Sequence, residues 1–187
     1  MRWKVILKTI KNSGYPSKEA CIALLIEYGT PKGVIAHCRK VAQVAEAVAL
    51  ELNRCGLKLN ISLVVAAGCL HDIARVHSKH DIVGADYLTS IGMKQVADII
   101  ENHTFYHIEH KGFQIDEKDV LCIADRVVID DSYVGPEKRM EYIIEKAVKK
   151  FGEEKRRDLE KTAANFVEYI RELESFMGKK FVDFLVQ

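Results

Sequence analysis

The most informative feature of the chain is the stretch GCLHDIAR, residues 68–75, in which an apolar helical segment ends in two consecutive polar side chains. Neighbouring residues on a helix differ by about 100° in direction. The side chains of His71 and Asp72 can therefore still reach one point beyond the helix end. A neutral imidazole beside a carboxylate suits a divalent metal ion. A solvated helix terminus is the alternative explanation of the same pair.

The rest of the chain predicts an all-α fold. Apolar residues recur at i, i+3, i+4 and i+7, and few runs alternate with period two. The three Pro and most of the eleven Gly fall at or near the ends of these segments. The expected helices are 1–11, 16–28, 31–54, 61–74, 82–91, 93–103, 116–130, 136–151 and 153–177, followed by a short tail at 181–185. Three residues are expected to cap helix starts, Thr30, Asn60 and Asp81, and Asp116 or Glu117 is expected to start the helix that runs to Asp130.

Length and composition exclude several classes of protein. A chain of 187 residues predicts one domain, 1–187. The net charge of +1 gives no basic field, so no nucleic-acid partner is expected. No apolar run approaches the roughly 20 residues of a membrane span, and Lys4 and Lys8 interrupt the only N-terminal apolar run, so no membrane contact is expected. The five Cys are scattered without a CxxC pair, which is typical of reduced thiols in a cytoplasmic protein.

Further His and Asp residues lie in or beside apolar helical segments. Asp125 interrupts the apolar run 121–124, and a buried, unpaired carboxylate is costly, so this residue needs a cation. His37, alone, would more often be a core histidine with a hydrogen-bond partner. The combined candidates are His37, His71, Asp72, His80, His103 and Asp125. Four imidazoles and two carboxylates are the kind and number of ligands that can hold two divalent ions with one carboxylate bridging them.

The order His37, His71-Asp72, Asp125 resembles the HD superfamily of metal-dependent phosphohydrolases. The matching motifs are EYGTP at 27–31, HDIAR at 71–75, His80 with Gly84-Ala85 and Leu88, IIENH at 99–103 and ADR at 124–126. The resemblance covers about 16–130 and implies an HD-domain helical bundle there, with 131–187 as a helical C-terminal extension. The two additional His are similar to those of the dinuclear branch, which includes bacterial hydrolases of dinucleoside tetraphosphates.

The resemblance also implies a ligand set. It assigns the first metal ion to His37, His71, Asp72 and Asp125. Asp72 then bridges to a second ion, which His80 and His103 complete. Iron or manganese is favoured, with magnesium, zinc, nickel or cobalt as alternatives, because His-rich sites suit borderline transition metals better than Mg²⁺.

The expected reaction is hydrolysis of a phosphate ester or anhydride of a nucleotide-like small molecule by metal-activated water. Asp72 and Arg75 are the expected catalytic residues, and Arg75, Lys79 and Arg126 the expected substrate-binding residues. Many family members carry Lys at the position of Arg75, whereas Arg can grip a phosphate through two parallel hydrogen bonds. An HD-type diiron oxygenase and a nucleotide-sensing regulatory module are the alternatives. The charged helix 153–177 could form the seam of a homodimer or pack on its own domain.

Overall fold

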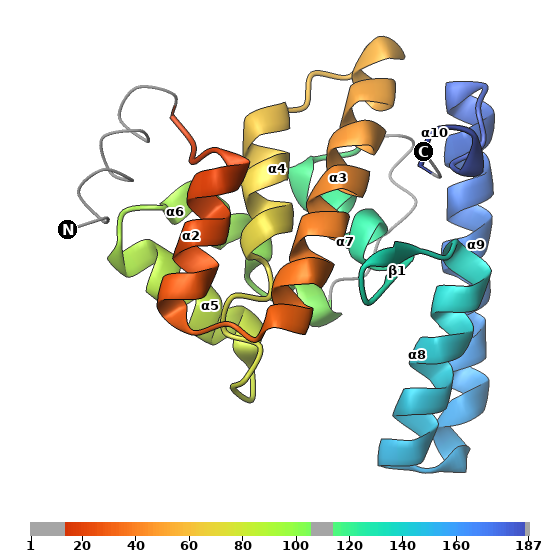
Figure 1. Cartoon of the computed structure of the whole chain (residues 1–187). Helices are drawn as coiled ribbons and strands as arrows, with labels where there is room; N and C mark the ends of the chain where they lie inside the picture. The colour runs from red at the N-terminus through yellow and green to blue at the C-terminus, as the bar shows by residue number, and fades with distance from the viewer. Residues whose placement is uncertain (1–13, 106–113, 186–187) are drawn as a thin grey trace.

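The protein is described by a computed structural model that covers residues 14–105 and 114–185 (Figure 1). The helix expected at 1–11 lies outside these residues. Within them, regular structure is almost entirely helical, which confirms the all-α prediction. In the described part of the chain, no helix combines the length and the apolarity that crossing a bilayer requires.

The α-helices are α2 (Lys18–Tyr28), α3 (Lys32–Arg54), α4 (Ile61–Leu70), α5 (His80–Ser90), α6 (Lys94–Ile100), α7 (Glu117–Asp125), α8 (Pro136–Phe151), α9 (Arg156–Met177) and α10 (Val182–Leu185). Two 3₁₀ turns are η1 (His103–Phe105) and η2 (Glu153–Lys155). A two-stranded antiparallel hairpin, β1 (Val128–Ile129) and β2 (Ser132–Tyr133), follows α7 and pairs Val128 with Tyr133.

Helix α4 is the centre of the bundle. It is apolar on every side, its residues 63–70 are all buried, and it packs against α2, α3, α6 and α7. Its closest neighbour is α3, beside it in Figure 1. A Cβ at Gly68 would lie 2.8 Å from the Cα of Ala42, so only glycine allows the two backbones to approach this closely. This approach brings the end of α4, and with it His71, next to α3.

Helices α8 and α9 pack against each other and stand at one side of the bundle of α2–α7 (Figure 1). The apolar stripe of α9 is covered by the chain itself, since Ala163, Phe166, Ile170 and Leu173 are buried. Of the two uses expected for this helix, packing on its own chain therefore explains the apolar stripe of α9. The homodimer stays a prediction.

Several helix boundaries agree with the sequence. Asn60 caps α4 by accepting a hydrogen bond from the Leu63 amide (3.1 Å). Asp116 caps α7 and forms a reciprocal capping box with Asp119, in which each side chain accepts from the other residue's backbone N–H. Pro136 begins α8, as expected from its locked φ.

The helix predicted at 61–74 ends earlier, at Leu70. The Oγ1 of Thr30 donates to the Ile73 carbonyl (2.8 Å), which in a continued α-helix would accept from the amide of His77. That amide instead bonds to the Ala74 carbonyl, and residues 71–79 form a series of tight turns. The prediction that Thr30 caps the next helix is therefore wrong; Pro31 occupies that position.

Three other predicted boundaries are also wrong. Asp81 lies buried in the first turn of α5 rather than capping it, because Lys79 adopts φ 57° and the helix begins at His80. The helix predicted at 93–103 spans Lys94–Ile100, and Asn102 has φ 60°. The helix predicted at 116–130 ends at Asp125; the β1–β2 hairpin follows, and Asp130, at φ 51°, lies in the turn between its two strands. A left-handed residue cannot continue a right-handed helix.

Candidate metal centre

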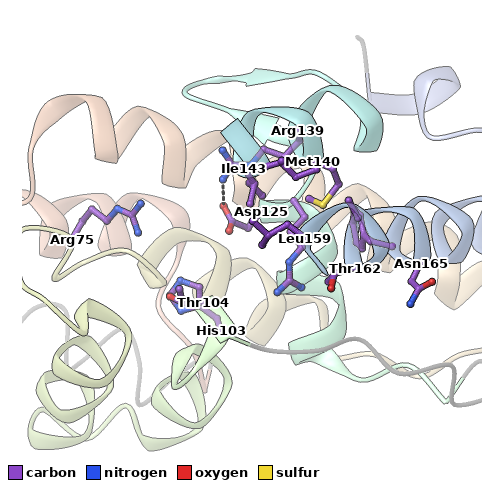
Figure 2. Close-up of a pocket in the computed structure, with 14 residues that line it drawn as sticks. Arg75, His103, Thr104, Asp125, Arg139, Met140, Ile143, Leu159, Thr162 and Asn165 are labelled. Carbon is purple, nitrogen blue, oxygen red and sulfur yellow. Dashed lines mark ion pairs between the residues drawn. The ribbon is translucent and has the colours of Figure 1, made fainter. Parts of the chain in front are cut away.

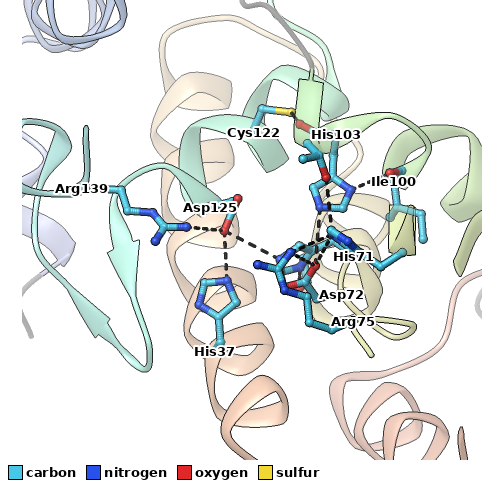
Figure 3. Close-up of polar contacts among 12 residues, drawn as sticks. His37, His71, Asp72, Arg75, Ile100, His103, Cys122, Asp125 and Arg139 are labelled. Atoms are coloured by element: carbon cyan, nitrogen blue, oxygen red, sulfur yellow. Dashed lines mark hydrogen bonds and ion pairs between the residues drawn. The ribbon is translucent and has the colours of Figure 1, made fainter. Parts of the chain in front are cut away.

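Five segments bring the six predicted ligands together. His37 comes from α3, His80 from the start of α5, His103 from η1 and Asp125 from the end of α7. His71 and Asp72 directly follow α4. Figure 3 shows side chains of these segments, among them His37, His71, Asp72, His103 and Asp125, gathered at one place.

The first of two clusters contains His37, His71 and Asp72, whose candidate ligand atoms all lie within 4.8 Å of one another. Asp125 borders it: its Oδ1 lies 3.0 Å from Nε2 of His37 and 3.8 Å from Nε2 of His71. The other carboxylate, Asp72 Oδ2, is 3.7 Å from the same His71 nitrogen. Two imidazoles and two carboxylates therefore face one point.

The second cluster contains Asp72, His80 and His103, again within 4.8 Å of one another. Asp72 Oδ1 lies 3.0 Å from Nε2 of His80 and 3.7 Å from Nε2 of His103. Asp72 is the residue that belongs to both clusters. Its two oxygens point to different clusters, which is the arrangement that a bridging ligand requires.

Backbone carbonyls orient three of the four imidazoles. Nδ1 of His37 bonds to the Asp130 carbonyl (2.8 Å), Nδ1 of His71 to the Gly68 carbonyl (2.9 Å) and Nδ1 of His103 to the Ile100 carbonyl (2.7 Å). A carbonyl can only accept, so Nδ1 carries a proton in all three; Nε2 of His71, which has no hydrogen bond among the described residues, then keeps its lone pair, whereas Nε2 of His37 faces the carboxylate of Asp125 (3.0 Å). Metal-binding histidines in proteins are held in this way.

Two buried atoms in the clusters lack a hydrogen bond among the described residues: Nε2 of His71 and Oδ1 of Asp72. His71 is fully buried and Asp72 is 5% exposed. Buried polar atoms are nearly always hydrogen-bonded, because an unsatisfied one costs free energy. Both atoms are electron-pair donors that face the clusters, so a cation is the partner that this chemistry fits.

The protonation states of His71 and of the two carboxylates suit a metal, although the carboxylates beside His37 and His103 outweigh burial and raise the pKa of these two imidazoles. Burial lowers the pKa of His71 to about 4, which keeps its imidazole neutral. Burial opposes ionisation of Asp72 and Asp125, but the neighbouring imidazoles outweigh it and hold the pKa of both carboxyls below the usual range. Metal ligands must be neutral imidazoles and ionised carboxylates.

Two arginines border the clusters. Nη1 of Arg75 donates to Nε2 of His80 (2.9 Å) and lies 3.5 Å from Oδ1 of Asp72. Nη2 of Arg139 lies 3.6 Å from Oδ1 of Asp125, as Figure 3 shows. Arg75 is one of the residues predicted from the sequence, whereas Arg139 is not. Nothing in the spacing of α8 signals a contact with α7, so only the fold could reveal it.

Two cavities open from the centre. The larger, about 540 Å³, lies between the clusters and the α8–α9 pair and has an apolar wall that includes Met140, Ile143 and Phe166 (Figure 2). Arg75 and Arg126, both predicted to bind substrate, line it. The smaller cavity, about 450 Å³, is bordered by the clusters and by one face of α8. Lys79 is exposed and lines neither cavity, so its predicted role gains no support from its position.

Comparison with known proteins identifies the family of the chain. The family described as HD domain matches residues 34–130, more than half of the 187 residues. A tRNA (cytidine(56)-2'-O)-methyltransferase of Thermoplasma volcanium is 32% identical over 155 residues, which cover 81% of this chain but only 41% of that protein. An uncharacterized protein of Methanocaldococcus jannaschii is 33% identical over 130 residues, 64% of this chain and 76% of that protein. No solved structure gives a significant match. The chain belongs to the HD domain family.

Proposed function

We propose that the protein is a metal-dependent phosphohydrolase that cleaves a phosphate ester or anhydride of a nucleotide-like small molecule. The observation that carries this proposal is the position of Asp72, which is shared by two His-rich clusters and has a buried oxygen that forms no hydrogen bond within the described part of the chain. Membership of the HD domain family supports metal-dependent hydrolysis as the reaction class.

In this proposal, His37, His71, Asp72 and Asp125 hold one ion, and Asp72, His80 and His103 hold a second. Iron or manganese suits the imidazole-rich sets better than magnesium, which prefers oxygen ligands. Bound divalent ions would supply an activated water near neutral pH and a Lewis acid for the phosphate oxygens. In the structure, His80 accepts a hydrogen bond from Arg75, so this arginine must turn away before His80 can act as a ligand.

Arg75 is well placed to bind a phosphate once it turns. Its side chain is 50% exposed, and it lines both cavities beside Asp72. Arg139 approaches from the opposite side, next to Asp125. Two guanidinium groups can then orient the phosphate and stabilise the negative charge that develops on it, each with a planar set of donors.

The experiment is a screen of phosphorylated metabolites with protein loaded separately with iron, manganese or magnesium under anaerobic conditions. Phosphate release that Asp72→Ala abolishes is the expected result. In a parallel assay in air, oxygen uptake by the iron-loaded protein, without phosphate release in either assay, would instead indicate the oxygenase alternative. Nucleotide binding without turnover under every metal would indicate the regulatory module.

The match to a tRNA methyltransferase favours a second candidate, action on RNA. The expectation that no nucleic acid is a partner therefore has no support from the comparisons. The chain spans 41% of that protein, so its activity does not have to reside in the matched segment. Incubation of the chain with tRNA and a labelled methyl donor tests this candidate; methyl transfer that survives Asp72→Ala would show that the RNA reaction does not need the clusters.

A further inference from the structure

One face of α8 borders the candidate metal centre although α8 lies outside the matched residues 34–130. The residues of this face occupy positions i, i+3, i+4, i+7 and i+11, so they lie on one side of the helix. They are Arg139, Tyr142, Ile143, Lys146 and Lys150. All five line the smaller cavity, whose opposite side includes His37, Asp72 and Asp125.

Arg139 on this face faces Asp125, but neither Lys146 nor Lys150 has a carboxylate partner among the described residues. Their ammonium groups lie over aromatic rings instead, Lys146 at 4.5 Å from the ring of Tyr142 and Lys150 at 4.9 Å from that of Phe151. The guanidinium of Arg139 also lies over the Tyr142 ring, at 5.4 Å, and its buried Nε lacks a hydrogen bond in the described structure.

The acidic groups of the same cavity lie at its other end. Asp72 and Asp125 face the imidazoles of the clusters, and Asp130 holds His37 through its backbone carbonyl. Along α8, a helical rise of 1.5 Å per residue separates Arg139 from Lys146 by about 10 Å and from Lys150 by about 16 Å. A single phosphate at the clusters cannot reach both lysines, whereas a chain of linked phosphates can.

We infer that this basic face of α8 binds the distal phosphates of an oligophosphate, so that the preferred substrates are phosphoanhydrides with several linked phosphates rather than simple monophosphate esters. The inference rests on the proposed function for the position of the reacting phosphate. An RNA backbone offers similar charges, but the cations form one short row inside a cavity of about 450 Å³ and the chain carries a net charge of only +1. An extended polyanion favours a broader basic surface.

The test is calorimetric binding of inorganic tripolyphosphate and inorganic orthophosphate to the full chain without added metal. Wild type should bind tripolyphosphate more tightly than orthophosphate. The double variant Lys146→Ala/Lys150→Ala should lose about 25-fold in affinity for tripolyphosphate, about fivefold for each exposed charge pair. Its affinity for orthophosphate should not change. Lys149→Ala, a neighbouring exposed lysine that does not line the cavity, is the matched control and should behave as wild type.

Equal tripolyphosphate affinity in wild type and the double variant would overturn the inference, as would an equal loss in the Lys149→Ala control. A short single-stranded RNA that binds more tightly than tripolyphosphate and loses affinity in the same double variant would assign the face to RNA instead. The proposed function is tested separately by turnover. Hydrolysis that is unaffected by the double variant overturns only the inference, whereas selective tripolyphosphate binding without any hydrolysis overturns the proposed function, and with it the assignment of substrates, and leaves only the binding of linked phosphates by this face.

Discussion

Replacing Asp72 by alanine should remove both metal ions at once. The binding free energy of a structural zinc site with four ligands is about 10–16 kcal/mol, which is about 2.5–4 kcal/mol for each ligand. The loss of one ligand should therefore weaken the affinity for the metal by about 10²–10³-fold. Asp72 belongs to both clusters, so this loss should apply to both sites. Any other single ligand should affect mainly its own cluster.

The consequence is measurable as thermal stability. A metal present at 100 times its dissociation constant stabilises the fold by about 2.7 kcal/mol. For a chain of this size, that raises the midpoint of unfolding by about 5–10 °C. After a 10²–10³-fold loss of affinity, the same metal concentration stabilises Asp72→Ala by at most about 0.4 kcal/mol, or about 1–2 °C.

The assay is a thermal melt with and without manganese, combined with elemental analysis of the protein after gel filtration. Asp98→Ala is the matched control, since Asp98 is exposed and pairs only with Lys94 in the described structure. It should keep the full metal-dependent shift. A wild-type shift and a wild-type metal content in Asp72→Ala, with its circular dichroism unchanged, would refute the bridging assignment.

Three other variants test separate parts of the structure. His80→Ala should empty the second site and leave the first, so that elemental analysis gives one ion per chain; loss of both ions or of neither would contradict the division into two clusters. Gly68→Ala places a Cβ 2.8 Å from the backbone of Ala42 and should lower the free energy of unfolding in urea by about 1–3 kcal/mol, whereas an unchanged midpoint would show that α3 and α4 can separate freely. Thr30→Val leaves the buried Ile73 carbonyl without its donor and should cost about 1–3 kcal/mol in the same assay; a neutral result would mean that water replaces the hydroxyl.

A helix boundary could be predicted where the signal is local, whereas the caps expected at Thr30 and Asp81 were wrong. Asn60 and Asp116 cap their helices through side chains that lie three residues from the amides they bind, so the signal is contained in a few neighbouring residues. The end of α4 depends instead on Thr30, which is 43 positions away from the Ile73 carbonyl. A local pattern cannot reveal a competitor that arrives from another helix.

The sequence by itself determined the helical class, the family resemblance and the identities of the candidate ligands. Helical periodicity is a local property, and a carboxylate such as Asp125 on an apolar run is conspicuous wherever it lies. The tertiary structure decided which imidazole faces which carboxylate, and it placed Asp72 between the two clusters. It also brought Arg139 and the basic face of α8 to the centre. These relations depend on how closely α3, α4, α7 and α8 pack, and packing distances between residues far apart in the chain arise only when the whole core is assembled.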